Sequence, residues 1–129
     1  MPFRRRASEQ DDPLRRAFGL VASQIDHAQR ALLAAVPTSR DQGIPLRDAL
    51  DAFIHSLDDA ARGMDSWKGE RLAHEWTKCS DGITEARELA AHLRERNVEL
   101  TFEQLNAQIG DVLYPLEAFV DAERSVRRR

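Results

Sequence analysis

Four histidines spread along the chain are its first candidates for metal chemistry: His27, His55, His74 and His92. In a helix, His55 and Asp59 would share one face, because residues four apart lie one above the other. Imidazole and carboxylate groups together bind several transition metals. At about 100° per residue, however, each histidine projects away from the apolar side of its own segment. The pattern therefore predicts histidines that face solvent and no transition metal inside the protein.

Two acidic motifs stand in the second half of the chain. The first reads Glu-Ala-Arg-Glu-Leu from Glu85, and the second reads Gln-Ile-Gly-Asp-Val-Leu-Tyr from Gln108. Together they resemble the Glu-x-x-Glu and Glu-x-x-Asp motifs of the MazG-type all-α nucleoside-triphosphate pyrophosphohydrolases, whose clustered carboxylates hold Mg²⁺. The resemblance implies Mg²⁺ as cofactor and Glu85, Glu88 and Asp111 as its ligands. It departs from the family at Gln108, where a carboxylate is expected, and the two glutamates point away from the apolar stripe.

Two shorter patterns indicate other functions. The tripeptide Trp-Lys-Gly at positions 67–69 resembles the Trp-x-Gly turn of helical-hairpin proteins exported by actinobacterial type VII systems. Their export element needs an acidic residue four positions after a tyrosine, whereas Ala118 follows Tyr114 here. A tryptophan that closes one end of an apolar core is the alternative interpretation. Arg87 and His92 have the spacing of the nuclease motif of HEPN-type helical domains, without its other features.

Positive charge is concentrated at the two ends of the chain. The sequence has 17 arginines and two lysines, a preference typical of high-GC bacteria, and arginine triplets occupy positions 4–6 and 127–129. Removing these six charges lowers the net charge from −3 to −9, so an acidic body carries two basic tails. Clustered charge accelerates association with an oppositely charged partner. We therefore expect partner binding by Arg4, Arg5, Arg6, Arg127, Arg128 and Arg129, and the alternative is that both tails are solvated and only keep the protein soluble.

The elements that must position these residues are helices, because apolar residues recur at alternating spacings of three and four. The predicted helices cover residues 12–36, 45–64, a third segment and 101–126. The third segment can be capped by Asp65 or Ser66, has its apolar stripe from Leu72 to Leu93 and ends at Asn97, and residues 67–69 lie in the short connection before it. Pro37 and Asn97 are expected to end the first and third, and Thr101 with Gln104 forms a capping-box pattern. Helices with this period and short connections pack nearly parallel. The sequence thus predicts an all-α, antiparallel up-down four-helix bundle whose termini lie at the same end.

The length of 129 residues suits one helical-bundle domain over 1–129, with polar or basic tails at 1–11 and 127–129. Four apolar stripes should form its core, with Phe18, Phe53, Trp76 and Phe119 as the large members. Cys79 is expected to be a small core residue. Pro115 should bend the last helix near Asp111, and helix–helix close approaches are expected at Gly19, Gly82 and Gly110.

These observations contain no strong catalytic signature, and they predict no catalytic residue and no cofactor. We expect a small soluble interaction or assembly module that binds another protein or a second copy of itself. Nucleic acid is a weaker candidate, because the acidic body would repel a long polyanion. No apolar run approaches the ~20 residues of a membrane span, and no signal-like stretch follows the first residues, so a cytoplasmic location is expected. A Mg²⁺-dependent pyrophosphohydrolase and a type VII-secreted helical protein remain the alternatives, and whether the protein is an enzyme stays open.

Overall fold

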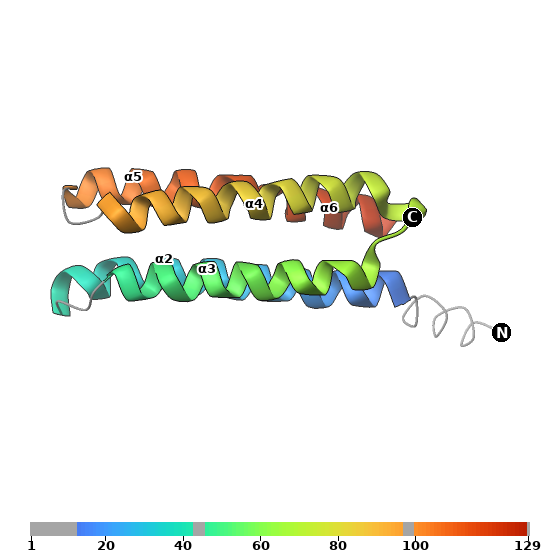
Figure 1. Ribbon diagram of the computed structural model, residues 1–129, viewed down its shortest axis with the longest axis horizontal. Helices are drawn as coiled ribbons and strands as arrows, with labels where there is room; N and C mark the ends of the chain where they lie inside the picture. The colour runs from blue at the N-terminus through green and yellow to red at the C-terminus, as the bar shows by residue number, and fades with distance from the viewer. Residues whose placement is uncertain (1–12, 43–45, 97–99, 129) are drawn as a thin grey trace.

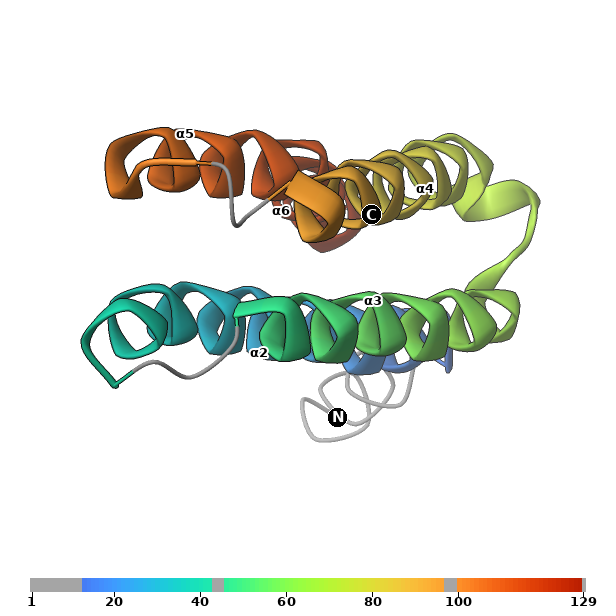
Figure 2. The same cartoon turned by 60° about the vertical axis from the view of Figure 1, so that its left-hand side comes forward.

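The computed structural model describes residues 13–42, 46–96 and 100–128, and within these ranges the chain is helical and contains no strand. Three helices come first: α2 (Pro13–Gln42), α3 (Leu46–Gly63) and α4 (Ala73–Arg96). The fourth segment consists of α5 (Phe102–Leu113), the 3₁₀ turn η4 (Tyr114–Leu116) and α6 (Glu117–Arg128). Helices α2 and α3 form one layer, and α4 with the fourth segment forms the other (Figures 1 and 2). The predicted all-α bundle is confirmed.

The start of α2 and the end of α6 lie at the same end of the bundle (Figure 1). A hydrogen bond joins them, since the Arg15 guanidinium donates to the main-chain oxygen of Arg127 over 3.4 Å. The up-down topology therefore brings the two ends of the described chain to one pole, as predicted. In the described ranges, no helix is long and apolar enough to cross a membrane.

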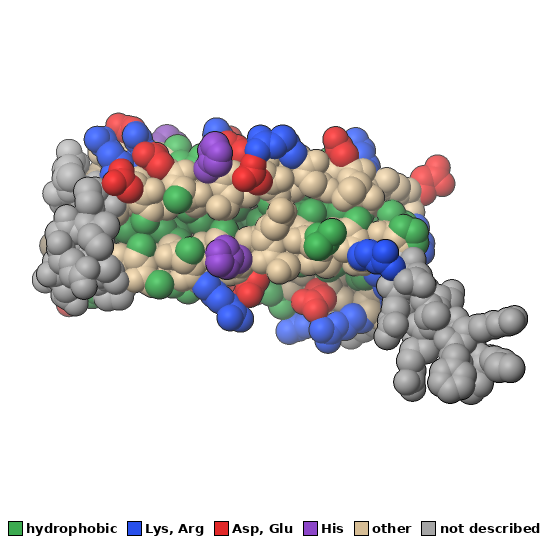
Figure 3. Space-filling view, turned by 90° about the horizontal axis from the view of Figure 1, so that it is seen from below, with side chains coloured by type: hydrophobic (Ala, Val, Ile, Leu, Met, Phe, Trp, Pro, Cys, Tyr) green, Lys and Arg blue, Asp and Glu red, His purple; other side chains and the backbone are tan. Residues whose placement is uncertain are grey.

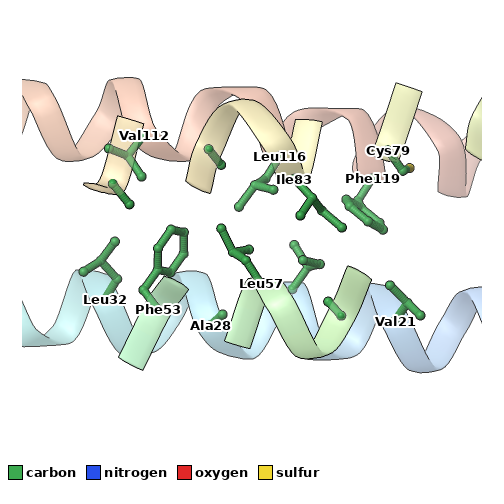
Figure 4. Close-up of a cluster of buried hydrophobic side chains, with 14 of the residues drawn as sticks. Val21, Ala28, Leu32, Phe53, Leu57, Cys79, Ile83, Val112, Leu116 and Phe119 are labelled. Atoms are coloured by element: carbon green, nitrogen blue, oxygen red, sulfur yellow. The ribbon is translucent and has the colours of Figure 1, made fainter. Parts of the chain in front are cut away.

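The predicted stripes form one continuous hydrophobic cluster between the layers. Side chains of the α2–α3 layer point toward those of α4 and the fourth segment (Figure 4). Most stripe residues are fully buried, while Leu14, Trp76, Phe102 and Leu105 pack against the cluster and are only partly buried. Trp76 is thus not a fully buried member of the core, contrary to the prediction. The interpretation of Trp67 as a tryptophan that closes one end of the core is confirmed, since Trp67 is 0% exposed. Helical periodicity identified the faces correctly.

The connection between α3 and α4 is longer than predicted. Two 3₁₀ turns, η1 (Met64–Trp67) and η2 (Glu70–Leu72), precede α4, which begins at Ala73 and not near residue 65. Gly69 between them is extended, with φ 177° and ψ 168°, so the helix cannot run through it. The turn directs Trp67 into the core, where its ring meets that of Phe18 edge-on at 5.1 Å.

Two prolines also act differently from the prediction. Pro37 does not end α2, which continues to Gln42, because a proline removes only one N–H donor and the residues after it can still bond in helical geometry. Pro115 interrupts the fourth segment at η4 and not at Asp111. The capping box between Thr101 and Gln104, by contrast, is present with both of its hydrogen bonds.

Gly82 marks a close approach of two elements. A Cβ atom there would come within 2.5 Å of the Pro115 carbonyl oxygen, so a larger residue would push η4 away from α4. The same expectation is wrong for Gly19 and Gly110, where an added Cβ would meet nothing within 4 Å. Ion pairs of Arg87 with Asp58, at 2.7 Å, and of Arg94 with Asp51 join α4 to α3 on the surface.

Candidate functional site

Of the three hollows described below, the one with the greatest volume lies between α2 and α6, where the two helices pack loosely. Helix α6 packs mainly on α4 and η4, whereas α2 packs on α3, η1 and α5. Between α2 and α6 remains an open groove of about 470 Å³. We call it the α2–α6 groove, and its lining includes Arg15, Phe18, Gly19, Ala22, Ser23, Ile25, Asp26, Gln29, Leu116, Phe119, Val120, Glu123, Val126 and Arg127.

The floor of the α2–α6 groove is aromatic and rigid. The rings of Phe18 and Phe119 stack with centroids 6.3 Å apart and planes at 22°. The buried Trp67 lies edge-on to Phe18 from the core side. All three rings belong to the hydrophobic core, whose close packing restricts their movement.

The two walls differ in the size of their side chains. Gly19, Ala22 and Ser23 form the α2 wall, where residues three and four apart share a helix face. The α6 wall carries Val120, which is 45% exposed although it is aliphatic. The small residues on α2 explain why the seam is not filled. The sequence carries this signal as a Gly-x-x-Ala-Ser pattern beside the apolar stripe, but the predicted close packing at Gly19 obscured it.

Charged groups border the groove. At the pole, Arg127 pairs with Glu123 at 2.7 Å and accepts the Arg15 hydrogen bond on its main-chain oxygen. Farther along α2, Asp26 pairs with Arg30 at 3.0 Å. The groove therefore has an apolar middle and a basic end.

The structure places the proposed Mg²⁺ ligands on the surface. Glu85 and Glu88 are exposed on α4, and Asp111 is exposed on α5. Within residues 13–42, 46–96 and 100–128, no group of three or more His, Cys, Asp or Glu residues has the geometry to hold a metal ion. All four histidines are exposed, as the helical wheel predicts. The structure thus does not bring the three carboxylates into one such group.

Of the six tail arginines, only Arg127 is fully described. It is exposed at the end of α6, and the backbone of Arg128 completes that helix. Arg4, Arg5, Arg6 and Arg129 lie outside the described residues. The described arginines at this pole include Arg15 and Arg16 on α2, Arg124 and Arg127 on α6, Arg62 at the end of α3 and Arg71 in η2.

A buried carboxylate, Glu75, was missed by the sequence analysis. It is 3% exposed and accepts a hydrogen bond of 2.9 Å from Ser125 on α6. It also lines a hollow of about 190 Å³ between α4 and α6. Burial first, and then the charge of Glu75, raise the pKa of the Cys79 thiol to about 12. Position 75 lies one helical turn before Cys79, on the apolar side of α4. This position could have predicted from the sequence that Glu75 is buried.

The outer face of α2 and α3 has a third hollow, of about 260 Å³. Hydrophobic side chains form a strip between the two helices, and charged side chains flank it (Figure 3). Alanines 28, 31, 49 and 52 supply much of its lining, with Ser56 and His27 at its edge. No Lys, Arg, Asp or Glu lines this hollow, whereas four of them border the α2–α6 groove.

Comparisons with models of protein families, with curated proteins and with solved structures found no match for this chain.

Proposed function

We propose that this protein is a non-catalytic interaction module that binds an apolar-faced segment of another protein in the α2–α6 groove. The groove itself carries the proposal. It has the greatest volume of the three hollows described, its floor consists of aromatic rings of the core, and it exposes aliphatic surface at Val120. Apolar surface in a preformed groove is a common basis of protein recognition.

The polar border supports a protein ligand over a small apolar molecule. Backbone and side-chain groups at Ser23, Asp26, Gln29 and Glu123 line the edges of the groove, as the polar rim of a protein interface does. Along α2 the lining extends from Arg15 to Gln29, which is about 21 Å at 1.5 Å per residue. A hollow of this length and openness matches a peptide segment.

The arginine tails extend this proposal. In the sequence, the triplet at 4–6 precedes α2 and the triplet at 127–129 begins within the last turn of α6, although Glu9, Asp11 and Asp12 lie between the first triplet and α2. Changing all six arginines to alanine should lower the association rate with the partner and reduce its dependence on salt. Retention of the same partner at the same salt concentration would show that the tails have no binding role.

Site-specific photo-crosslinking tests the proposed function. A benzophenone amino acid at position 120 points from the α6 wall, and one at position 20 is the control, because Leu20 is 67% exposed but does not line the groove. In the native host, position 120 should give an adduct with another protein that position 20 does not give. Peptide mapping should place the crosslink in an apolar-faced segment.

Three results would contradict the proposal. Identical adducts from both positions would mean that the groove has no special role. Adducts between two copies of this chain would assign the groove to self-association. Crosslinks to polar segments alone would exclude an apolar contact as the basis of binding.

A further inference from the structure

No packing contact within the described protein requires a glycine at position 19. It lies inside α2 and is exposed, and an added Cβ would meet no heavy atom within 4 Å. Gly82 is different, since the backbone of Pro115 excludes a side chain there. What distinguishes Gly19 from the equally open Gly110 is its position in the lining of the α2–α6 groove.

The α2 wall suits the close approach of another helix. Gly19, Ala22 and Ser23 share one face and have small or absent side chains. Helices pack with axes about 8–10 Å apart, and small residues at the contact allow the lower end of that range. The opposite wall offers Leu116 and Val120 for the sides of the same helix. The groove has the form of an empty helix position beside α2 and α6.

The positive charge at the pole favours a bound helix whose end at this pole is acidic. Arg15 and Arg16 stand in the first turns of α2, and Arg124 and Arg127 stand at the end of α6. Glu123 is the only carboxylate within the last seven residues of the described α6. The same region of α2, from 13 to 25, has no acidic residue. On the two helices that line the groove, an acidic group that enters at this end therefore meets four arginines and one carboxylate, while Asp65 and Glu70 stand in the neighbouring turns η1 and η2.

We infer that the α2–α6 groove binds an amphipathic helix of the partner protein, with its apolar face on Gly19 and Ala22 and its acidic end at Arg15 and Arg127. This inference rests on the proposed function and specifies the chemistry of the partner. In helix-in-groove binding, apolar residues of the helix at spacings of three and four contact the groove. The charges at the pole determine the direction in which the helix lies.

Two synthetic peptides of about 18 residues, long enough to form helices, serve as probes. Both carry the same leucine and alanine face, and one has two glutamates in its first turn where the other has two lysines. At low ionic strength, fluorescence anisotropy should give a dissociation constant about tenfold lower for the glutamate peptide, since each exposed ion pair contributes up to a few-fold. The double variant Arg15→Glu, Arg127→Glu should abolish this preference. The double variant Arg47→Glu, Arg96→Glu, whose residues are exposed at the opposite end of the bundle, should leave it unchanged.

Gly19→Leu and Gly110→Leu form a matched pair, because both positions are exposed helical glycines with open space. Both variants should fold, which thermal melting monitors independently. Gly19→Leu should weaken the glutamate peptide at least tenfold, whereas Gly110→Leu should not change its affinity. Equal effects of the two variants, or equal affinities of the two peptides for the unmodified protein, would overturn the inference.

The crosslinking experiment distinguishes failure of the proposed interaction function from failure of the inferred amphipathic helix. If position 120 gives a groove-specific adduct but the crosslinked segment is basic or lacks helical apolar spacing, the inferred helix is wrong and the interaction function stands. If neither a groove-specific adduct nor peptide binding is found, both are wrong. A crosslinked segment with an apolar helical face and an acidic end supports both.

Discussion

Truncating Trp67 should destabilise the protein more than truncating Trp76. Trp67 is completely buried and contacts the Phe18 ring edge-on, and removal of such a side chain costs about 3–5 kcal/mol. Trp76 is only partly buried. Its indole N–H donates to the Met64 carbonyl oxygen at 2.9 Å, and Lys68 lies 4.6 Å from its ring. Loss of the hydrogen bond and of the cation–π contact, about 1 kcal/mol each, predicts a cost of about 2 kcal/mol.

Trp67→Phe separates the apolar contribution of the ring from that of its N–H group. The Trp67 Nε1 atom is buried and has no hydrogen-bond partner among the described residues, and such an orphan donor costs about 1–3 kcal/mol. Phenylalanine removes this cost while it loses part of the apolar area, so we expect a change of about 1 kcal/mol or less.

Guanidinium unfolding, followed by circular dichroism at 222 nm, measures all three variants. Matched denaturant slopes would show that the variants unfold from the same native state. Equal losses for Trp67→Ala and Trp76→Ala, or a larger loss for Trp76→Ala, would refute the packing assigned to η1. A loss of 3 kcal/mol or more for Trp67→Phe would contradict the orphan-donor argument.

Three further predictions concern backbone packing, titration and catalysis. Gly82→Ala should lower the free energy of unfolding by about 1–2 kcal/mol, because its Cβ meets the Pro115 backbone. Gly19→Ala should instead raise the free energy of unfolding by about 0.5–1 kcal/mol. If denaturant unfolding shows that both variants change stability in the same direction, this prediction is wrong. The folded-state pKa of Cys79, about 12, exceeds its ordinary value of 9.0, so the unfolded chain loses this proton first and stability should fall between pH 9 and 12. Unfolding curves for Cys79→Ala should lack that component, and identical pH profiles would refute it. With Mg²⁺ and a panel of nucleoside triphosphates, we expect no pyrophosphate release above the blank; release that is lost when the three carboxylates become amides would instead support an enzyme with ligands Glu85, Glu88 and Asp111.

Helix faces and chain direction were determined by the sequence itself. The three-and-four spacing of residues such as Val21, Ile25 and Ala28 placed them in the core, because helical periodicity is a local property of the backbone. The same periodicity placed the histidines outside. Short connections between long helices then required an antiparallel arrangement, which put Arg15 and Arg127 at one pole.

Several features depended on contacts between distant parts of the chain. Trp67 and Trp76 differ little in their local sequence signals, and which ring is buried depends on the path of η1 beneath Phe18. Glu75 lies on an apolar stripe, and its burial is compatible with folding because Ser125 reaches it from α6. Neither partner is visible from local spacing, since 50 residues separate Glu75 from Ser125.

The α2–α6 groove was likewise decided by tertiary structure. At Gly82 the missing side chain lets α4 and η4 approach closely, and this contact holds the fourth segment on α4. Opposite it, Gly19 and Ala22 are too small to fill the space toward α6. A single helix can show which of its faces is apolar. Which pair of helices remains open depends on side-chain volumes summed across elements that lie far apart in the chain.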